Sequence, residues 1–556
     1  MNGGKTMSKR ILALLLALVM MLSLLTACGG STERRDKHAA INQDADAIAT
    51  EPPDDSKATI TVATWDGGIG SQWLELAAKE FEAKYAEATH FEDGKVGVDV
   101  IIKASRSYDG SAIHLTPLKE DIYFVEAVDY YALIGNDKVI DITDVVTGSL
   151  SEYGEEGTIK DKMEPSVESF LETDGKYYAI PFYETFYSFA YDLDLWDAKS
   201  YYMTANGGWT DASGELSAGP DGAAGTIDDG MPATYDDFNK LLARMRDTGV
   251  TPFIYPGNAP DYVSNMLYEQ WANYEGGEQM LLNYTFDGTA TDLIEVDADG
   301  NVTELPATEI SFDNGYELQR QAGRYYTLKF CEDVMLSSQD NYKVIDTHIN
   351  AQTYFINGGI TNNNPVGMIV EGSWWENEAK KAFSDLESGG YERHNYRVMP
   401  MPHATADKIG QKPTWIAMSN SYGFVAKEGC KNVALAKEFM KFLHTDAQLS
   451  AFSAETNMTR ALKYEISEAD KAKLSTYALS ILDLKANSNV YYPVCDNPIV
   501  LDNAYYFGNF AWAWLTKVDG KETKSPWLYF KDGENTSAES YFAGQIDMFE
   551  SKWNYF

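Results

Sequence analysis

The residues best placed for chemistry in this sequence are two tryptophans that follow a short apolar run. The run 366–370 is bounded by Pro365 and Gly372, which is typical of a strand buried on both faces of a sheet. Trp374 and Trp375 come directly after, where the chain turns out of the strand. A flat indole at such a corner can stack on the apolar C–H face of a sugar ring. We therefore expect Trp374 to bind a ligand, and one of the two tryptophans to belong to the core.

The same corner contains a helix-start signal. Ser373 and Glu376 have the spacing of a capping box, in which each side chain satisfies a backbone N–H group as a helix begins. In open α/β sheets, ligands bind beyond the carboxyl ends of the strands, where a helix start also offers N–H groups. The stretch therefore predicts a ligand site at the edge of a sheet.

The elements around this corner alternate as they do in an α/β fold. Residues 58–64 are rich in β-branched side chains and predict a strand, and a glycine-containing loop then leads into a helix over 71–85. In that helix Trp73, Ala77 and Phe81 recur every four residues and form one apolar face. Further strands are predicted at 96–102, 122–125, 178–181 and 186–191, and a further helix at 235–246.

The first 28 residues predict export and lipid attachment. A basic start, with Lys5, Lys9 and Arg10, precedes an apolar stretch over 11–25, which is short for a membrane span of about 20 residues. The sequence LTAC at 25–28 resembles the bacterial lipobox, whose cysteine carries diacylglycerol. We therefore expect 1–27 to be a signal peptide and Cys28 to be the lipidated first residue of the mature protein.

Composition indicates an extracytoplasmic body on a tether. Residues 28–57 are polar, with few large apolar side chains, and predict a flexible tether. The chain has 45 basic and 84 acidic residues, a net charge of -39, which argues against nucleic acid and anionic substrates as partners. With 44% hydrophobic and 13% aromatic residues, it can build large cores, and its length predicts two or more domains.

Cysteine and histidine usage predicts no zinc site. Beyond Cys28 the chain has Cys331, Cys430 and Cys495, so at most one disulfide can form, and isolated buried thiols are the expectation. No two cysteines have metal-ligand spacing, and no pair of histidines has the spacing H-x-x-x-H.

The glycine- and aspartate-rich stretch 206–232 has two interpretations. Its side-chain oxygens could surround a calcium ion, although their spacing is not that of an EF-hand. The alternative is a solvated, turn-rich loop before a helix that Thr234 and Asp237 cap. Apart from this structural calcium, we expect no cofactor. The candidate ligands are Asp211, Ser213, Asp221, Asp228 and Asp229.

Several stretches, taken in order, resemble the extracellular solute-binding proteins of ABC importers, in the carbohydrate-binding group (family 1) that includes maltose-binding protein. The resemblance covers about 58–556. The stretches are TWDGG after the first strand, LIGNDKVIDITD at 133–144, DGKYYAIPFYETFYSFAYDLDLW at 174–196, DDGMPATYDDFNKLL at 228–242, GMIVEGSWWENEAKKAF at 367–383, SYGFVAK at 421–427 and LAKEFMKFLHTDAQLSAFSAETNMTRALKYE at 435–465.

This resemblance implies a two-lobed α/β fold of the periplasmic-binding-protein type (type II), with one ligand in the cleft between the lobes. It implies crossing segments near 183–186, 415–423 and 457–462, so that each lobe is discontinuous in sequence. The first lobe would comprise 58–183 and 420–458, and the second 187–415 and 462–556.

The resemblance also implies a function and a site. The chain would be a monomeric lipoprotein, held on the outer face of the bacterial cell membrane, that delivers a sugar or oligosaccharide to ABC transporter permease subunits and is not an enzyme. Trp514 or Tyr506 could replace Trp512 in the site, because that segment departs in length from the maltose-binding pattern. The implied ligand-binding residues are Trp65, Asp66, Tyr183, Glu184, Trp374 and Trp512.

Two other functions stay open. A secreted glycoside hydrolase needs two carboxylates across a cleft, and Glu184 and Glu371 are the best pair by position. Carboxylates also accept hydrogen bonds from sugar hydroxyls in binding proteins, so Glu371 is equally a candidate ligand-binding residue. An adhesin or cell-surface glycan sensor would differ only in its partner. Motifs of serine hydrolases, zinc proteases and kinases do not occur in the sequence.

Overall fold

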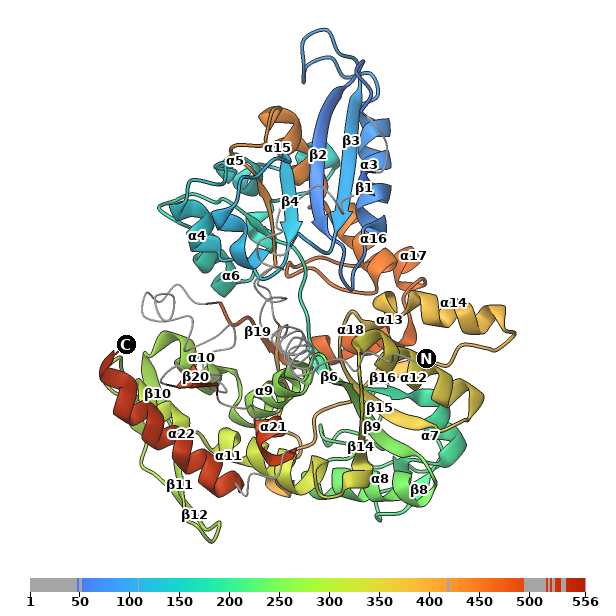
Figure 1. Cartoon of the computed structure of the whole chain (residues 1–556), viewed down its shortest axis with the longest axis vertical. Coiled ribbons are helices and arrows are strands. Elements are labelled where there is room, and N and C mark those ends of the chain that lie inside the picture. Colours follow the sequence, from blue (N-terminus) through green and yellow to red (C-terminus); the bar gives the residue numbers. More distant parts are fainter. Residues whose placement is uncertain are drawn as a thin grey trace, which may run out of the picture.

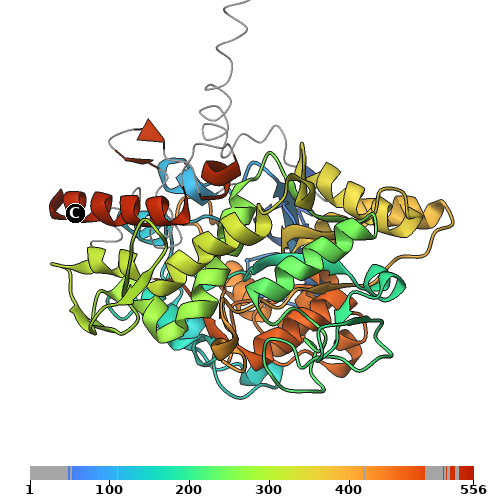
Figure 2. The same ribbon diagram turned by 90° about the horizontal axis from the view of Figure 1, so that it is seen from below.

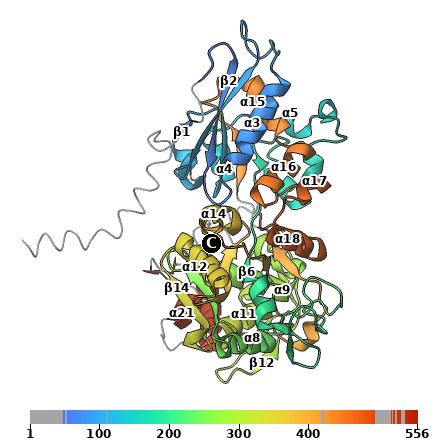
Figure 3. The same ribbon diagram turned by 90° about the vertical axis from the view of Figure 1, so that its right-hand side faces the viewer.

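The computed structural model describes residues 53–108, 110–417, 421–494, 526–531 and 537–555, together with the backbone of short strands at 48–49, 517–518 and 521–522. The described chain forms two α/β lobes, one above the other in Figure 1 and, from the side, in Figure 3. We call the upper one, blue to cyan with orange helices, the first lobe, and the lower one the second lobe. Each lobe is built around one sheet.

The sheet of the first lobe confirms the predicted βαβ start. Strand β2 pairs in parallel with β3 and β4, while β18 pairs antiparallel with β4 and β5. Because β18 comes from late in the chain, this lobe combines two distant stretches of sequence. The strands, in sheet order, are β1 (Ile48–Ala49), β3 (Val98–Ser105), β2 (Ala58–Trp65), β4 (Ile122–Val125), β18 (Tyr422–Val425) and β5 (Ile180–Pro181).

Helices cover this first sheet. In α3 (Gln72–Lys84) the predicted apolar residues Trp73, Ala77 and Phe81 are all buried, as the four-residue spacing requires. The ring of Trp73 lies edge-on to Phe124 of β4, with centroids 5.6 Å apart. The other helices of this lobe are α4 (Tyr130–Gly135), α5 (Thr143–Thr147), α6 (Pro165–Leu171), α15 (Val433–Phe442), α16 (Asp446–Thr456) and α17 (Glu468–Lys471).

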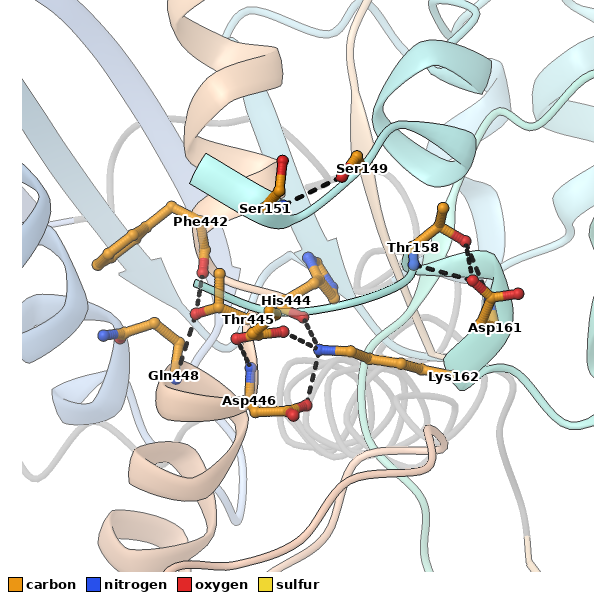
Figure 4. A network of polar contacts seen from close by, with 11 residues as sticks. Ser149, Ser151, Thr158, Asp161, Lys162, Phe442, His444, Thr445, Asp446 and Gln448 are labelled. Atoms are coloured by element: carbon orange, nitrogen blue, oxygen red, sulfur yellow. Dashed lines mark hydrogen bonds and ion pairs between the residues drawn. The ribbon is translucent and has the colours of Figure 1, made fainter. Parts of the chain in front are cut away.

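A buried lysine joins the two sequence stretches of the first lobe. Lys162 Nζ donates to the His444 carbonyl at 2.9 Å and pairs with Asp446 at 2.7 Å and Glu155 at 2.8 Å (Figure 4). In the same turn Thr445 caps α16 by accepting the N–H of Gln448 at 3.4 Å. The turn between α15 and α16 is therefore fixed to the segment before α6.

The sheet of the second lobe contains the predicted buried strand. All seven residues of β15 are buried, and β15 pairs in parallel with β9 and antiparallel with β6. The sheet is thus mixed, with β9, β14 and β15 running the same way. The strands, in sheet order, are β14 (Tyr342–Ile345), β9 (Thr251–Pro256), β15 (Val366–Gly372), β6 (Tyr187–Asp192) and β16 (Tyr396–Val398).

The predicted helix at 235–246 and its cap are confirmed. Helix α8 begins after Thr234, whose Oγ1 accepts the N–H of Asp237 at 3.2 Å and donates to its carboxylate at 2.9 Å. Helix α22 runs along one edge of the molecule seen from below (red in Figure 2). The helices of this lobe are α7 (Leu193–Lys199), α8 (Tyr235–Asp247), α9 (Asp261–Glu275), α10 (Gly277–Thr285), α11 (Ala322–Lys329), α12 (His348–Thr361), α13 (Trp375–Glu378), α14 (Lys380–Ser388), α18 (Thr476–Asn487), α21 (Pro526–Lys531) and α22 (Ala538–Lys552).

Short strand pairs complete the second lobe. Four of these pairs are antiparallel, and β17 pairs in parallel with β19 beside the crossing segments. The pairs are β7 (Tyr202–Met203) with β8 (Trp209–Thr210), β10 (Gly288–Ala290) with β13 (Thr308–Ile310), β11 (Ile294–Val296) with β12 (Val302–Glu304), β17 (Thr414–Ile416) with β19 (Asn489–Tyr491), and β20 (Lys517–Val518) with β21 (Lys521–Glu522).

The predicted capping box at Ser373 and Glu376 is wrong. Helix α13 begins after Trp374, with no side-chain cap. Ser373 Oγ instead accepts the backbone N–H of Phe186 at 3.4 Å, and Glu376 pairs with Arg393 at 2.7 Å. Partners distant in sequence therefore replace the local bonds that the motif predicts.

The segments at which the chain crosses between the lobes are hydrogen-bonded to one another. Between β5 and β6, the N–H of Phe182 donates to the Ser421 carbonyl at 2.8 Å, and the N–H of Glu184 donates to the Thr459 carbonyl at 3.2 Å. These bonds join the segments predicted to cross near 183–186, 415–423 and 457–462. The lobe boundaries given from the sequence stay predictions.

Candidate functional site

A cavity of about 440 Å³ lies between the two lobes. On the side of the first lobe, Trp65 ends β2, while Arg106 and Glu126 directly follow β3 and β4. These three strands run in parallel, so their carboxyl ends meet at one edge of the sheet.

The second lobe contributes in the same way. Asp261 and His348 begin α9 and α12, the helices that follow β9 and β14, and Trp374 follows β15. The carboxyl ends of parallel strands from both sheets therefore face the same cavity. The corner predicted at Trp374, after β15, is therefore one of several strand ends that line this cavity.

Aromatic rings form much of the lining. Trp374 is partly exposed, and its ring lies edge-on to Tyr187 and Tyr262, with centroid distances of 5.2 and 5.5 Å. Trp65 and Tyr183 complete the aromatic lining. Edge-to-face packing holds the Trp374 indole in one orientation, which lowers the entropy cost of stacking a ligand on it.

Two glycines let this indole approach the backbone. A Cβ atom added at Gly68, in the loop after β2, or at Gly372, at the end of β15, would collide with the Trp374 ring. Because Gly68 belongs to the first lobe and Trp374 to the second, the ring contacts backbone across the cleft.

Polar contacts also join the lobes beside the cavity. Asn377 Nδ2 donates to the Gly68 carbonyl at 2.6 Å, and Arg106 pairs with Glu378 at 3.5 Å. Lys380 of α14 pairs with Glu455 of α16 at 3.4 Å. The structure therefore shows the two lobes in contact around the cavity, which is a closed arrangement.

The electrostatic environment of the cavity is acidic. Burial raises the pKa of the Tyr187 hydroxyl, and the carboxylates of Asp261 and Glu126 raise it further. The pKa of Tyr262 is also raised, by burial and then by the nearby Glu371. Negative charge on these tyrosines is thus disfavoured first by burial and then by carboxylates that are ionised at the high pH where a tyrosine titrates.

Three of the residues predicted for the site line the cavity: Trp65, Tyr183 and Trp374. Asp66 lies next to it, in an adjoining hollow of about 480 Å³ beside α3 and α13. Trp512, its alternatives Trp514 and Tyr506, and the predicted lipidation site Cys28 lie outside the described residues. The ligand contacts of all these residues stay predictions.

Glu371 is buried in β15 and does not belong to the cavity lining. Gln352 Nε2 donates to its carboxylate at 3.1 Å and to that of Glu378 at 2.9 Å. Burial and the neighbouring Glu378 raise the pKa of Glu371 to about 8. Glu371 is therefore protonated at neutral pH and contributes no charge there.

Glu184 lies in the crossing segment, where its side chain is 1% exposed. Its carboxylate accepts hydrogen bonds from Thr459 Oγ1 and, at 2.5 Å, from Tyr492, and it pairs with Lys485. These donors fix the first crossing to the third, to α18 and to the segment after it. Glu184 does not line the cavity.

The sequence analysis missed most of the polar lining. Glu126, Asp261 and Glu378 follow strands of the two sheets but lie far apart in the chain. A signal was available for Glu126 and Glu378, which follow the strands predicted at 122–125 and 366–370, because such positions gather at the carboxyl edge of a parallel sheet. It was not available for Asp261, whose preceding strand β9 was not predicted. Tyr262 is the second residue of α9, and Tyr187 begins β6 opposite Gly372, at the end of β15.

The aspartates of 206–232 bond mainly within their own loop. Asp228 is buried, which raises its pKa, and accepts the backbone N–H of Asp221 at 2.9 Å, while Asp229 accepts that of Gly225 at 2.7 Å. Asp211 accepts from Ser213. Calcium binding here stays a prediction, which melting temperatures in calcium and in chelator would test.

Elsewhere in the described ranges, one group of three potential metal ligands lies within 4.8 Å: Asp192, Asp194 and His394. A structural role accounts for its central member. Asp192 caps α7 through the N–H of Leu195 at 2.9 Å and pairs with His394 at 2.8 Å. Cys331 and Cys430 are free thiols, and Cys495 lies outside the described residues.

Two α/β lobes, joined by crossing segments and closed around one lined cavity, define a two-lobed binding protein of the periplasmic-binding-protein fold. The chain belongs to the family described as bacterial extracellular solute-binding protein, whose sequence model matches residues 86–473. This confirms the predicted family and fold class, and it implies an extracytoplasmic location. In the part of the chain that the structure describes, no helix combines the length and apolarity needed to span a membrane.

Solved structures show the same fold. The chain is similar to the GacH receptor of Streptomyces glaucescens GLA.O, solved unliganded and with acarbose or an acarbose homolog (TM-score 0.50, 15% identity, 89% of this chain and 99% of that one). It is also similar to a chitin oligosaccharide binding protein (TM-score 0.51, 12% identity, 89% and 99%). At these identities the similarity concerns the fold alone. No curated protein matches the chain in sequence.

Proposed function

We propose that this chain is the solute-binding lipoprotein of an ABC importer, which captures a sugar or oligosaccharide between its lobes and delivers it to permease subunits in the membrane. The observation that carries the proposal is the aromatic lining of the cavity, in a chain of the extracellular solute-binding family. The names of the similar structures, with acarbose and chitin oligosaccharide as ligands, support the sugar class.

The mechanism follows from the contacts that join the lobes. The Asn377–Gly68 and Arg106–Glu378 pairs connect surfaces that separate when the lobes rotate about the crossing segments. A ligand that contacts both lobes favours the closed form, because it binds that form more tightly. The permease would then recognise the joint surface of the closed lobes.

The two carboxylates that the sequence analysis paired as a possible hydrolase acid and nucleophile do not line the cavity. Glycoside hydrolases place an acid and a nucleophile or base on either side of the scissile bond. Glu184 accepts bonds from Thr459, Tyr492 and Lys485, and Glu371 is buried beneath the cavity. Neither belongs to the lining that a bound sugar would touch.

Calorimetry with a panel of neutral oligosaccharides and amino-oligosaccharides tests the proposal on the purified mature protein. We expect saturable binding with one site, and product analysis after long incubation should show the sugar intact. Release of shorter sugars would favour the hydrolase instead. A panel in which no sugar binds would contradict the proposal.

The anchor is tested separately in a host that processes lipoproteins. With Cys28→Ala, the protein should move from the membrane fraction to the soluble fraction, because no lipid can be attached. Cys430→Ala, at a half-buried thiol of the body, is the matched control and should stay with the membrane. A Cys28→Ala protein that fractionates like the wild type would contradict lipid anchoring at this residue.

A further inference from the structure

The corner after β15 contacts the first lobe at one glycine. Gly68 lies in the loop between β2 and α3, while Trp374 and Asn377 follow β15 of the second lobe. Asn377 Nδ2 donates to the Gly68 carbonyl at 2.6 Å. A Cβ atom added at Gly68 would lie 2.7 Å from Cγ and 2.9 Å from Cβ of Trp374. The Trp374 side chain and the Asn377 amide therefore both contact Gly68 across the cleft.

The backbone at Gly68 does not itself require a glycine. In the same loop Gly70 has a φ of 65°, which favours glycine, but Gly68 is not among the glycines with a positive φ. The three heavy atoms nearest to a Cβ atom at Gly68 all belong to Trp374. The ring of the opposite lobe is therefore what excludes a side chain at this position, and it does so when the lobes are in contact.

The Trp374 side chain has little room to move away from the first lobe. Its ring lies edge-on to Tyr187 and Tyr262, with centroids 5.2 and 5.5 Å away, and its six-membered part lies against Gly372. The atoms nearest to Gly68 are at the base of the side chain, next to the backbone of the corner. A closely packed ring cannot shift there without disturbing its neighbours, so a Cβ atom at Gly68 would keep the lobes apart.

Asn377 joins the lobes from outside the cavity. Its side chain is buried, with 8% of the residue exposed, and it lines the hollow beside α3 and not the cavity itself. Its Nδ2 donates to Gly68, and within the described structure its Oδ1 has no hydrogen-bond partner. The bond to Gly68 is therefore the one hydrogen bond of this side chain in the described structure, and it crosses the cleft.

The ion pairs beside the cavity are more exposed than this contact. Arg106 and Lys380 each pair with a glutamate of the opposite lobe, and their side chains are 57% and 51% exposed. Exposed ion pairs contribute little to stability, because water and salt screen their charges. The contacts at Gly68 are therefore the ones that can hold the lobes closed most effectively.

We propose that Gly68, Trp374 and Asn377 form a latch that stabilises the closed lobes, and that Gly68 and Asn377 are positioning residues that set the affinity for the solute through closure. The apparent Kd of a ligand that needs the closed form is its intrinsic Kd divided by the closed fraction, so each latch contact tightens binding. This inference rests on the sugar-binding function proposed above and adds the residues that hold the lobes together. Trp374 takes part in both, with its ring in the cavity lining and against Gly68.

A double-mutant cycle connects Gly68 to the Trp374 ring. Gly68→Ala should weaken the best-binding sugar of the panel about tenfold or more, because the added methyl group opposes closure. In the Trp374→Ala protein, where the ring is absent, the same substitution should change the affinity by less than about threefold. Calorimetry measures each protein. Gly135→Ala is the matched control, because a Cβ atom there has nothing within 4 Å, and it should bind like the wild type.

Asn377→Ala tests the other contact of the latch. It removes the donor to Gly68 and should weaken the same sugar about fivefold, as expected for the loss of one hydrogen bond. Asn136→Ala is its control, because it removes an amide whose bond to the Ala132 carbonyl, at 2.8 Å, lies within α4 of the first lobe. This control should leave the affinity unchanged. Circular dichroism confirms that each variant is folded.

Small-angle X-ray scattering separates a latch from a merely structural role. With saturating sugar, Gly68→Ala should keep a larger radius of gyration than the wild type and Gly135→Ala. Equal radii, or a loss of affinity that is the same with and without the Trp374 ring, would overturn the latch and leave sugar binding intact. If no sugar binds, the ligand-free proteins are compared. A larger radius for Gly68→Ala would then support the latch although the proposed function fails, and equal radii would overturn both.

Discussion

The cavity and the crossing segments beneath it both place carboxylates beside aromatic rings, but the two regions differ in how those carboxylates are satisfied. Glu184 in the crossing is buried and accepts from Thr459, Tyr492 and Lys485. Glu126, which accepts a hydrogen bond from the Tyr183 hydroxyl, and Asp261 line the cavity between the lobes. A carboxylate enclosed by protein donors holds segments together, whereas one facing a cavity can meet a ligand.

The adjacent tryptophans make the same contrast at one corner. Trp375 is 0% exposed and packs edge-on against Tyr396, with ring centroids 5.0 Å apart. Trp374, its neighbour, faces the cavity. Two identical side chains therefore lie one in the core and one in the cavity lining, and substitutions should separate the consequences of these positions.

The largest effect is expected for Trp375→Ala. Removing a fully buried indole leaves a cavity in the core, so the free energy of unfolding should fall by about 3–5 kcal/mol. Urea unfolding followed by circular dichroism measures the loss. Trp374→Ala is the matched control and should cost less stability, since its ring is partly exposed. Equal losses in the two variants would contradict the contrast.

Glu184→Ala should destabilise the protein by about 3 kcal/mol, because it leaves Lys485 and the buried hydroxyls of Thr459 and Tyr492 without their acceptor. Glu184→Gln, which keeps one acceptor oxygen, should cost less. Unfolding curves in urea give both values. If Glu184→Ala instead lowered sugar affinity at unchanged stability, Glu184 would belong to the binding site after all.

Trp374→Ala should weaken sugar binding by about 2 kcal/mol or more, which is more than tenfold in affinity, because it removes a pre-oriented aromatic anchor. Trp65→Ala should have a smaller effect. Calorimetry with the best ligand of the panel measures both. A folded Trp374→Ala protein with the affinity of the wild type would place the main stacking surface elsewhere.

Glu371 should act on the pH dependence of stability, and its effect at any one pH depends on where that pH lies within the range given next. Its pKa in the folded protein is about 8, above the usual value of 4.5, so between these values the native state holds a proton that the unfolded state has lost. Stability must therefore fall as pH rises through this range, by up to about 1.4 kcal/mol per pH unit.

In Glu371→Gln this contribution to the slope should vanish, while the side chain keeps an acceptor for Gln352. Urea unfolding between about pH 5 and pH 8 compares the two proteins. Parallel stability curves would show that Glu371 is not held protonated by its burial and by Glu378.

Local signals in the sequence were sufficient for much of the fold. The β-branched run before Trp65 and the apolar run before Trp374 are strands β2 and β15 in the structure. The four-residue apolar spacing predicted α3, and Thr234 marked the start of α8. Each signal acts within a few residues, through side-chain periodicity or a cap, so it does not depend on the rest of the chain.

Predictions based on a local motif were less reliable where the same side chains can also bond to residues distant in sequence. Ser373 has the right spacing for a cap but accepts the N–H of Phe186 instead. Glu376 likewise pairs with Arg393 and accepts from Ser475. A side chain at the junction of two lobes lies near possible partners from several segments. The spacing of residues in the sequence does not show which of these partners it will bond to.

By itself the sequence determined the alternating strands and helices, the aromatic corner at Trp374 and membership of the solute-binding family. Only the tertiary structure decided that Trp375 is core, that Glu184 holds the crossing segments, and that Glu126, Asp261 and Glu378 surround one cavity. The physical reason is distance along the chain. The bonds of Glu184 to Thr459 and Lys485 span 275 and 301 residues, and only the tertiary fold brings such distant segments together.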